Sequence, residues 1–127
     1  MRKVILLVVL VIGSNSAFAR WVEIGSNDAL ISYANPATIR KSGSKVKMWS
    51  VFDYKTAQGS DRPYISAKAL DEYDCKEEQT RTLSLSLHSE NMGNGDVVSV
   101  ITDTSQWMPV SPDSIGEIHW KFACKKR

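Results

Sequence analysis

The sequence contains few of the residues on which enzyme and metal chemistry depend. Its 127 residues include only two histidines and two cysteines. Zinc sites need four ligands at characteristic spacings, yet Cys75 and Cys124 are far apart in the chain and His88 and His119 stand alone. No G-x-S-x-G, H-E-x-x-H or phosphate-loop spacing is present. These absences favour a protein that is not an enzyme and has no catalytic residues, metal or cofactor.

The isolated histidines and glycines have ordinary structural explanations. His88 ends a strand-like segment on its polar side, and His119 lies in a helix-like one, so we expect both to be surface or partly packed residues. The Gly93-x-Gly95 pair joins two strand-like segments with no helix after it, which indicates a turn and no nucleotide loop.

The N-terminus is typical of a signal peptide. In MRKVILLVVLVIGSNSAFA, a basic start precedes the apolar run Val4–Ile12, and Ala17-Phe18-Ala19 forms a small-x-small cleavage site. The apolar run is about half of the roughly 20 residues that a membrane-spanning helix needs. We therefore predict a signal peptide at residues 1–19, a mature domain at residues 20–127, and no membrane anchor after cleavage.

The predicted mature domain has no excess of either positive or negative charge. Two of the 16 basic residues, Arg2 and Lys3, lie in the signal segment, so 14 remain against 14 acidic residues. This balance does not favour nucleic-acid binding. Arg20 stands where a bacterial lipoprotein has its acylated cysteine. The prediction is an exported protein, periplasmic or secreted, that is not a lipoprotein.

The two cysteines are expected to form a disulfide bond. Exported compartments are oxidising, so a single pair such as Cys75 and Cys124 is bonded by default. Closing a loop of about fifty residues stabilises a fold by about 4 kcal/mol in the chain-entropy model. The bond would bring the acidic segment DEYDCKEE, residues 71–78, toward the basic residues of the C-terminus, and we expect its acids to pair with them or to remain solvated, in preference to binding a cation. Those basic residues are Lys121, Lys125, Lys126 and Arg127.

Turn residues recur every ten or so positions, which predicts consecutive antiparallel strands. Residues 45–55 carry apolar side chains on both parities and should form a central strand. In residues 80–88, the leucines alternate with Thr82, Ser84, Ser86 and His88, which we expect to point outward. Residues 103–110 are expected to be a connection. The predicted strands are 21–25, 30–33, 45–55, 63–75, 80–88 and 97–101.

The C-terminal segment changes to a helical pattern. A helix ending at about Cys124 can begin at Ser111-Pro112 or at a capping box of Ser114 and Glu117. Apolar residues lie on two sides of this helix, so the pattern does not decide which side meets the sheet, or whether the other meets a second subunit.

The four tryptophans, Trp21, Trp49, Trp107 and Trp120, leave two alternatives open. Large aromatic residues in a small domain usually belong to the core, which is the interpretation that we favour. The alternative is a platform on which a ligand stacks.

Taken together, these residues resemble the bacterial surface-adhesin protein E family. The resemblance covers essentially the whole predicted mature chain. It rests on Trp21, YANPATI at 33–39, KVKMWSVFDYK at 45–55, EYDC at 72–75, R-x-LS at 81–84, WMPVSPDS at 107–114 and Cys124.

The resemblance implies an α+β fold, with a single antiparallel sheet of about six strands and a C-terminal helix tied to it by the disulfide. It also implies homodimerisation and a non-enzymatic, adhesin-like function, with host matrix or plasma proteins such as vitronectin and laminin as protein partners. Arg62 and Lys68 are candidate protein-binding residues. The alternative function is a periplasmic structural or stress-related protein that binds a bacterial partner.

Overall fold

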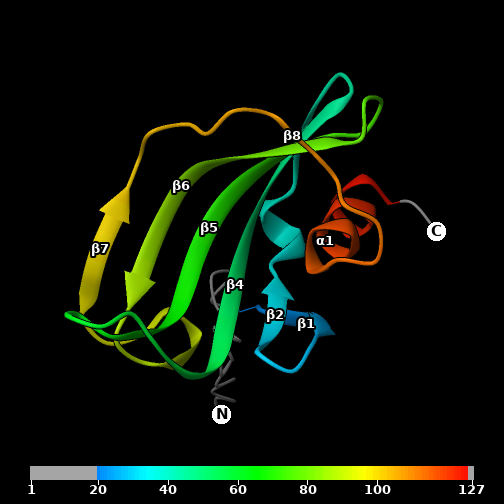
Figure 1. Ribbon diagram of the computed structural model, residues 1–127. Helices are drawn as coiled ribbons and strands as arrows, with labels where there is room; N and C mark the ends of the chain where they lie inside the picture. Colours follow the sequence, from blue (N-terminus) through cyan, green and yellow to red (C-terminus); the bar gives the residue numbers. More distant parts are fainter. Residues whose placement is uncertain (1–19, 126–127) are drawn as a thin grey trace, which may run out of the picture.

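The structure, a computed structural model, describes residues 20–125, so the predicted signal peptide at residues 1–19 lies outside the described residues. Six antiparallel strands follow one another across one sheet in the order β1-β2-β4-β5-β6-β7, and two short strands pair at its margins (Figure 1). This arrangement confirms the predicted antiparallel sheet. The strands are β1 Val22–Ser26, β2 Leu30–Ala34, β3 Arg40–Ser42, β4 Lys45–Gln58, β5 Tyr64–Asp74, β6 Gln79–His88, β7 Val97–Ile101 and β8 Met108–Pro109.

Strand β4 is central, as its two apolar parities predict. It pairs with β2 on one side and β5 on the other, and β3 extends the contact at its N-terminal end. Successive side chains of a strand point to opposite faces of a sheet. Val46 and Met48 belong to the buried core that also contains residues of the helix. We call their side of the sheet the helix face and the side that carries Trp49 the open face.

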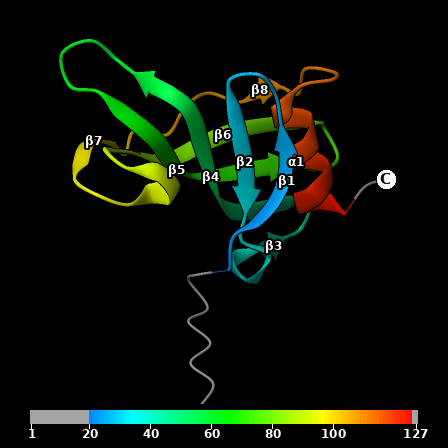
Figure 2. The same cartoon turned by 90° about the horizontal axis from the view of Figure 1, so that it is seen from below.

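The helix α1, Ile115–Cys124, begins at the Ser114 cap (Figures 1 and 2). Ser114 Oγ accepts a hydrogen bond from the backbone N–H of Glu117 at 3.1 Å, and Glu117 Oε1 accepts one from Asp113 N at 3.0 Å. The helix ends at Lys125, whose φ of 55° is left-handed. Of the two predicted starts, the one at Ser114 is therefore the correct one, because its side chain binds a backbone donor that the first turn leaves without a helical partner.

Both apolar sides of α1 meet the same chain. Trp120 and Ala123 pack with Val46 and Met48 on the helix face, and Trp120 Nε1 donates a hydrogen bond of 2.9 Å to the carbonyl of Asp74. On the other side, Ile118 lies against β1, where a Cβ added at Gly25 would stand 3.0 Å from Ile118 Cδ1. The curved sheet thus receives the helix between β1 and the central strands.

The disulfide between Cys75 and Cys124 links the helix to the sheet, as predicted. The two Cα atoms are 5.7 Å apart, and 49 positions separate the cysteines along the chain. Cys75 follows β5 on the same parity as the buried Tyr73, and both cysteines pack against the core. The bond therefore holds the last turn of α1 at the end of a central strand.

The prediction that DEYDCKEE pairs with the basic C-terminus is wrong for the residues that the structure describes. Asp74 Oδ1 instead accepts hydrogen bonds from the backbone of Lys76 and Glu77, at 3.0 and 2.9 Å, and closes its own turn. Glu72 pairs with Arg81 at 2.7 Å, and Lys121 pairs within the helix with Glu117. Lys126 and Arg127 lie outside the described residues.

The predicted outward set of β6 is also partly wrong. The register between β5 and β6 shifts between Leu70 and Asp71, a bulge that the alternating pattern does not encode. As a result Thr82 is paired with Asp71, and its hydroxyl donates a 2.7 Å hydrogen bond to that buried carboxylate. Burial raises the pKa of Asp71.

Both histidines are more deeply buried than their sequence positions suggest. His88 is 6% exposed although it lies on the predicted outer parity of β6, where Ser86 contacts its Nε2 at 2.7 Å. His119 is 1% exposed. Its Nδ1 is 3.1 Å from Ser50 Oγ, and its ring stacks on Phe52 with centroids 5.1 Å apart. Burial lowers the pKa of His119 to about 4.

Acid should therefore weaken the docking of α1 through His119. A folded-state pKa of about 4 lies below the ordinary value of 6.5, so the unfolded chain binds the proton more readily. The contribution of neutral His119 is complete above about pH 6.5 and is lost as the pH falls toward 4, by at most about 3 kcal/mol. Urea unfolding of wild type and His119→Asn at pH 7 and pH 4.5 measures it. The variant should lose less stability between the two pH values, and equal losses would contradict the assignment.

Candidate functional site

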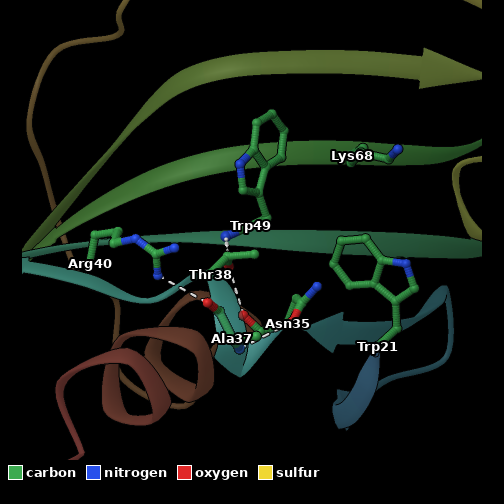
Figure 3. Close-up of a pocket in the computed structure, with 7 residues that line it drawn as sticks. All are labelled: Trp21, Asn35, Ala37, Thr38, Arg40, Trp49 and Lys68. Carbon is green, nitrogen blue, oxygen red and sulfur yellow. Dashed lines mark hydrogen bonds between the residues drawn. The ribbon is translucent and has the colours of Figure 1, made fainter. Parts of the chain in front are cut away.

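A concave pocket of about 480 Å³ lies on the open face of the sheet (Figure 3). Two indole rings and two cationic side chains contribute to it, and no acidic residue does. Pockets that bind small ligands or single side chains fall in the range of about 300–1,000 Å³ and combine apolar walls with a few polar groups. The lining residues are Trp21, Asn35, Ala37, Thr38, Arg40, Trp49 and Lys68.

Trp49 is positioned through its backbone by the turn after β2. Asn35 N donates to the carbonyl of Trp49 at 3.1 Å, and Trp49 N donates to Thr38 Oγ1 at 3.0 Å. The turn itself is the 3₁₀ helix η2, Pro36–Thr38, which Asn35 caps by accepting from Ala37 N at 3.1 Å. The asparagine-proline pair that predicts a turn in the sequence thus builds one wall of the pocket and fixes its central tryptophan.

Lys68 is held from the other side by the segment between β6 and β7. This segment contains the 3₁₀ helix η3, Asn91–Gly93, and it is fixed to the sheet by Asp53 and Ser66. Asp53 Oδ1 accepts from Met92 N at 3.0 Å, and Ser66 Oγ accepts from Gly93 N at 2.8 Å. Gly93 has a φ of +72°, and a Cβ there would stand 2.9 Å from Lys68 Cε. Glycine therefore allows this turn to lie directly on the lysine side chain.

The two cations of the pocket have no carboxylate partner. Three ion pairs join the residues from 20 to 125, and neither Arg40 nor Lys68 takes part in any of them. Arg40 uses Nη1 to donate to the carbonyls of Ala37 and Ile39, at 3.0 and 2.9 Å. It also stands directly across from Lys47 in the β3–β4 pairing. Lys47 in turn stands opposite Glu72 in the β4–β5 pairing, so this carboxylate lies beside Lys47, whereas the residue opposite Arg40 is a cation.

Another aromatic residue and cation meet on the sheet beyond the pocket. The guanidinium carbon of Arg81 lies 4.4 Å from the centroid of the Trp107 ring, a cation–π distance. Arg81 also binds Glu72, Nε to Oε1, at 2.8 Å. Leu70 of β5 lies opposite Trp49, and Glu72 is two residues further along β5, on the same side of the strand. The Glu72–Arg81 ion pair therefore lies on the open face. Its charge is already neutralised, unlike that of the pocket.

The structure separates the two candidate binding residues. Lys68 lines the pocket, whereas Arg62 is exposed in the loop of the β4–β5 hairpin and does not line it.

The expectation of a tryptophan core is wrong for three of the four rings, because only Trp120 belongs to the buried core. The strand parity of Trp49 opposite Met48 was the available signal. Trp21 could not have been placed without knowing how β1 pairs with β2, nor Arg40 without knowing how η2 and β3 fold.

Within residues 20–125, no group of three or more histidine, cysteine or acidic side chains is arranged to hold a metal ion. No helix in the same range is long and apolar enough to cross a membrane.

Fold and pocket together define a small, disulfide-tied antiparallel-sheet domain with a concave aromatic and cationic surface. The family model of surface-adhesin protein E matches residues 21–125, so the chain belongs to the surface-adhesin protein E family. Membership of this family implies an exported, adhesin-like protein. Among curated proteins, none matches the chain.

Solved structures of Haemophilus influenzae protein E share the fold. One superposes with a TM-score of 0.64 at 12% sequence identity and covers 84% of this chain and 85% of the other. Crystal form II of the same protein gives a TM-score of 0.61 at 12% identity, with 82% and 96% coverage. At this identity the likeness concerns the fold alone.

Proposed function

We propose that this protein is an exported, non-enzymatic, adhesin-like binding protein that recognises a protein partner through the open face of its sheet. The single observation that carries the proposal is the pocket, where two part-buried indoles meet two cations without a counter-ion. Tryptophan and arginine are the residues most enriched among those that dominate binding energy at protein interfaces. Family membership supports host matrix or plasma proteins such as vitronectin and laminin as partners.

Replacing Trp49 by alanine is expected to weaken binding to the partner about 30-fold, the effect of losing one dominant interface residue of about 2 kcal/mol. Surface plasmon resonance of the mature domain over immobilised vitronectin and laminin measures the change.

Lys68→Gln and Arg62→Gln should reduce the association rate more at low salt than at high salt, because salt screens the attraction between charges on the two proteins.

The control is Lys76→Gln, which removes an exposed charge at the β5–β6 turn, away from the pocket. It should bind like wild type. Absence of binding to both proteins at micromolar concentration would remove these partners. Cell fractionation supplies the complementary measurement, since protein found wholly in the periplasm would favour a bacterial partner instead.

We also propose that two copies associate through the edge strand β7. Among the described residues β7 pairs on one side only, with β6, and its side chains Val97, Val100 and Ile101 are 51%, 59% and 45% exposed. An apolar edge strand offers backbone groups and side chains to a second strand. Light scattering with size-exclusion chromatography should show a dimer for wild type and a monomer for Val100→Lys, and a wild-type monomer at high concentration would contradict this.

A further inference from the structure

The pocket on the open face carries an inference about what its partner presents. We propose that it binds an acidic residue and an adjacent aromatic side chain of an extended protein segment, with the aromatic ring between Trp21 and Trp49 and the carboxylate on Arg40, while Lys68 adds positive charge at the other end of Trp49. The inference rests on the proposed function in that a protein supplies this segment. It assigns the chemistry that the partner must have.

The walls favour a flat apolar group. Trp21, Ala37 and Trp49 contribute apolar surface to a pocket of about 480 Å³, a volume that accommodates a ring and its neighbours. Aromatic pairs gain about 0.5–1.5 kcal/mol beyond the burial of their area when they stack or meet edge to face. An aromatic side chain is therefore the group that these walls stabilise best.

The charges favour an anion next to that ring. Figure 3 shows Arg40 and Lys68 on either side of Trp49, so a ligand over this indole has a cation at each end. Arg40 has only Nη1 committed to backbone carbonyls, at 3.0 and 2.9 Å. Its remaining donors match a carboxylate, which binds arginine through charge-assisted hydrogen bonds. Gly93 contacts the Lys68 side chain and restricts its conformations before a ligand binds. Ordering the ammonium group on binding therefore costs less conformational entropy.

The hydrogen-bonding groups argue against a ligand rich in hydroxyls. Thr38 Oγ1 already donates to the carbonyl of Asn35 at 2.6 Å and accepts from Trp49 N at 3.0 Å. Asn35 Oδ1 accepts from Ala37 N at 3.1 Å. The uncharged polar side chains of the walls are thus engaged in building the pocket, so a sugar would depend on the two cations for hydrogen bonds to its hydroxyls.

The position of the pocket indicates recognition by side chains. Trp49 lies in β4 and Lys68 in β5, and both strands are paired on each side. Their backbone groups are not free to add a further strand, as they would be at a sheet edge. The segment must therefore lie across the face and insert its side chains between the indoles.

Nuclear magnetic resonance with short peptides tests the assignment. The probes are acetylated and amidated Gly-Asp-Phe-Gly, its neutral match Gly-Asn-Phe-Gly, and Gly-Asp-Ala-Gly, titrated to millimolar concentration. The indole N–H signals of Trp21 and Trp49 should shift with the first peptide, whereas that of Trp120 should not, because it is bonded to Asp74 in the core. The two matched peptides should each bind about tenfold more weakly, since each lacks one of the two recognised groups.

Variants and competing probes provide the controls. Arg40→Gln with Lys68→Gln should reduce affinity for the acidic peptide about tenfold and abolish its preference over the neutral match, whereas Lys76→Gln should change neither. Raising the salt on wild type should weaken the acidic peptide alone, a measurement that needs no variant. Equal affinity for the acidic and neutral peptides would overturn the inference. A larger shift of the same indoles by glucuronic acid would overturn it in favour of a saccharide.

These outcomes separate this inference from the proposed function. If Trp49→Ala loses binding to vitronectin or laminin while no peptide shifts the indoles, the peptide assignment is wrong and the binding function stands. If the acidic peptide binds as expected while neither protein does, the pocket chemistry stands and the partner is a different protein.

Discussion

Replacing both Cys75 and Cys124 by serine is expected to lower the free energy of unfolding by about 4 kcal/mol, a large share of the total stability of a small domain. The bond joins residues 49 positions apart, so its loss frees a long loop in the unfolded chain. Urea unfolding of the wild type and the double variant measures the difference. Reduction of the wild type serves as the matched control and should reproduce the loss.

Hydrogen exchange locates the effect of that replacement. Backbone amides of α1 should lose more protection than those of β4, because the bond constrains the helix directly and the sheet only through it. Unchanged protection of α1 in the double variant would mean that the apolar contacts of Trp120 and Ala123 hold the helix alone.

Replacing Trp120 by alanine is expected to cost about 3–5 kcal/mol, the usual range for removing a large aromatic residue from a core. The indole is 7% exposed and donates to the carbonyl of Asp74 at 2.9 Å. Trp120→Phe is the matched variant, since it retains an aromatic ring and removes the N–H donor. It should cost less than the alanine change, with about 1–3 kcal/mol from the unpaired carbonyl.

Thermal and urea unfolding of both variants at neutral pH test this prediction. Similar small losses for alanine and phenylalanine would show that the ring is not a principal contact between helix and sheet. The two replacements act at adjoining places, the disulfide and the indole both lying at the end of β5. Their effects are therefore expected to be non-additive when combined, as for residues that share contacts.

Much of the fold could be predicted because it follows from local patterns. The apolar residues on both parities of 45–55 predict a central strand, and β4 is paired with β2 on one side and β5 on the other. The Ser114 and Glu117 spacing predicts the helix start that the hydrogen bond confirms. These signals succeed because strand parity and helix capping depend on residues close in sequence.

The pocket could not be predicted in the same way because its parts come from four separate segments. Trp21 precedes β1, Arg40 starts β3, Trp49 lies in β4 and Lys68 in β5. Composition alone favours a core role for tryptophan. Strand parity places Trp49 and Met48 on opposite faces of the sheet, but it does not show which of the two faces another element covers. The covering is decided by the long-range docking of α1 on one face.

The burial of His88 has a comparable cause. His88 lies on the face of the sheet that carries Lys68, since His88 pairs with Ser66 and Lys68 with Ser86. What the alternation could not show is that the β6–β7 segment returns over that face, where Ser66 and Asp53 hold it. Alternation predicts the side of a sheet, whereas burial depends on what the chain later places there.

The Cys75–Cys124 bond also bears on the order in which the molecule assembles. Neighbouring strands of the sheet are mostly consecutive in the chain, so they can form through short loop closures, whereas α1 must return to β1 and β5 over long distances in sequence. Docking of the helix brings the two cysteines to a Cα separation of 5.7 Å, so oxidation captures that step. Once formed, the bond keeps a transiently released helix at high effective concentration beside its site. After a local opening, α1 should then dock again rapidly. This limits the time during which the apolar side chains of Met48 and Tyr73 are exposed to contact with other protein chains.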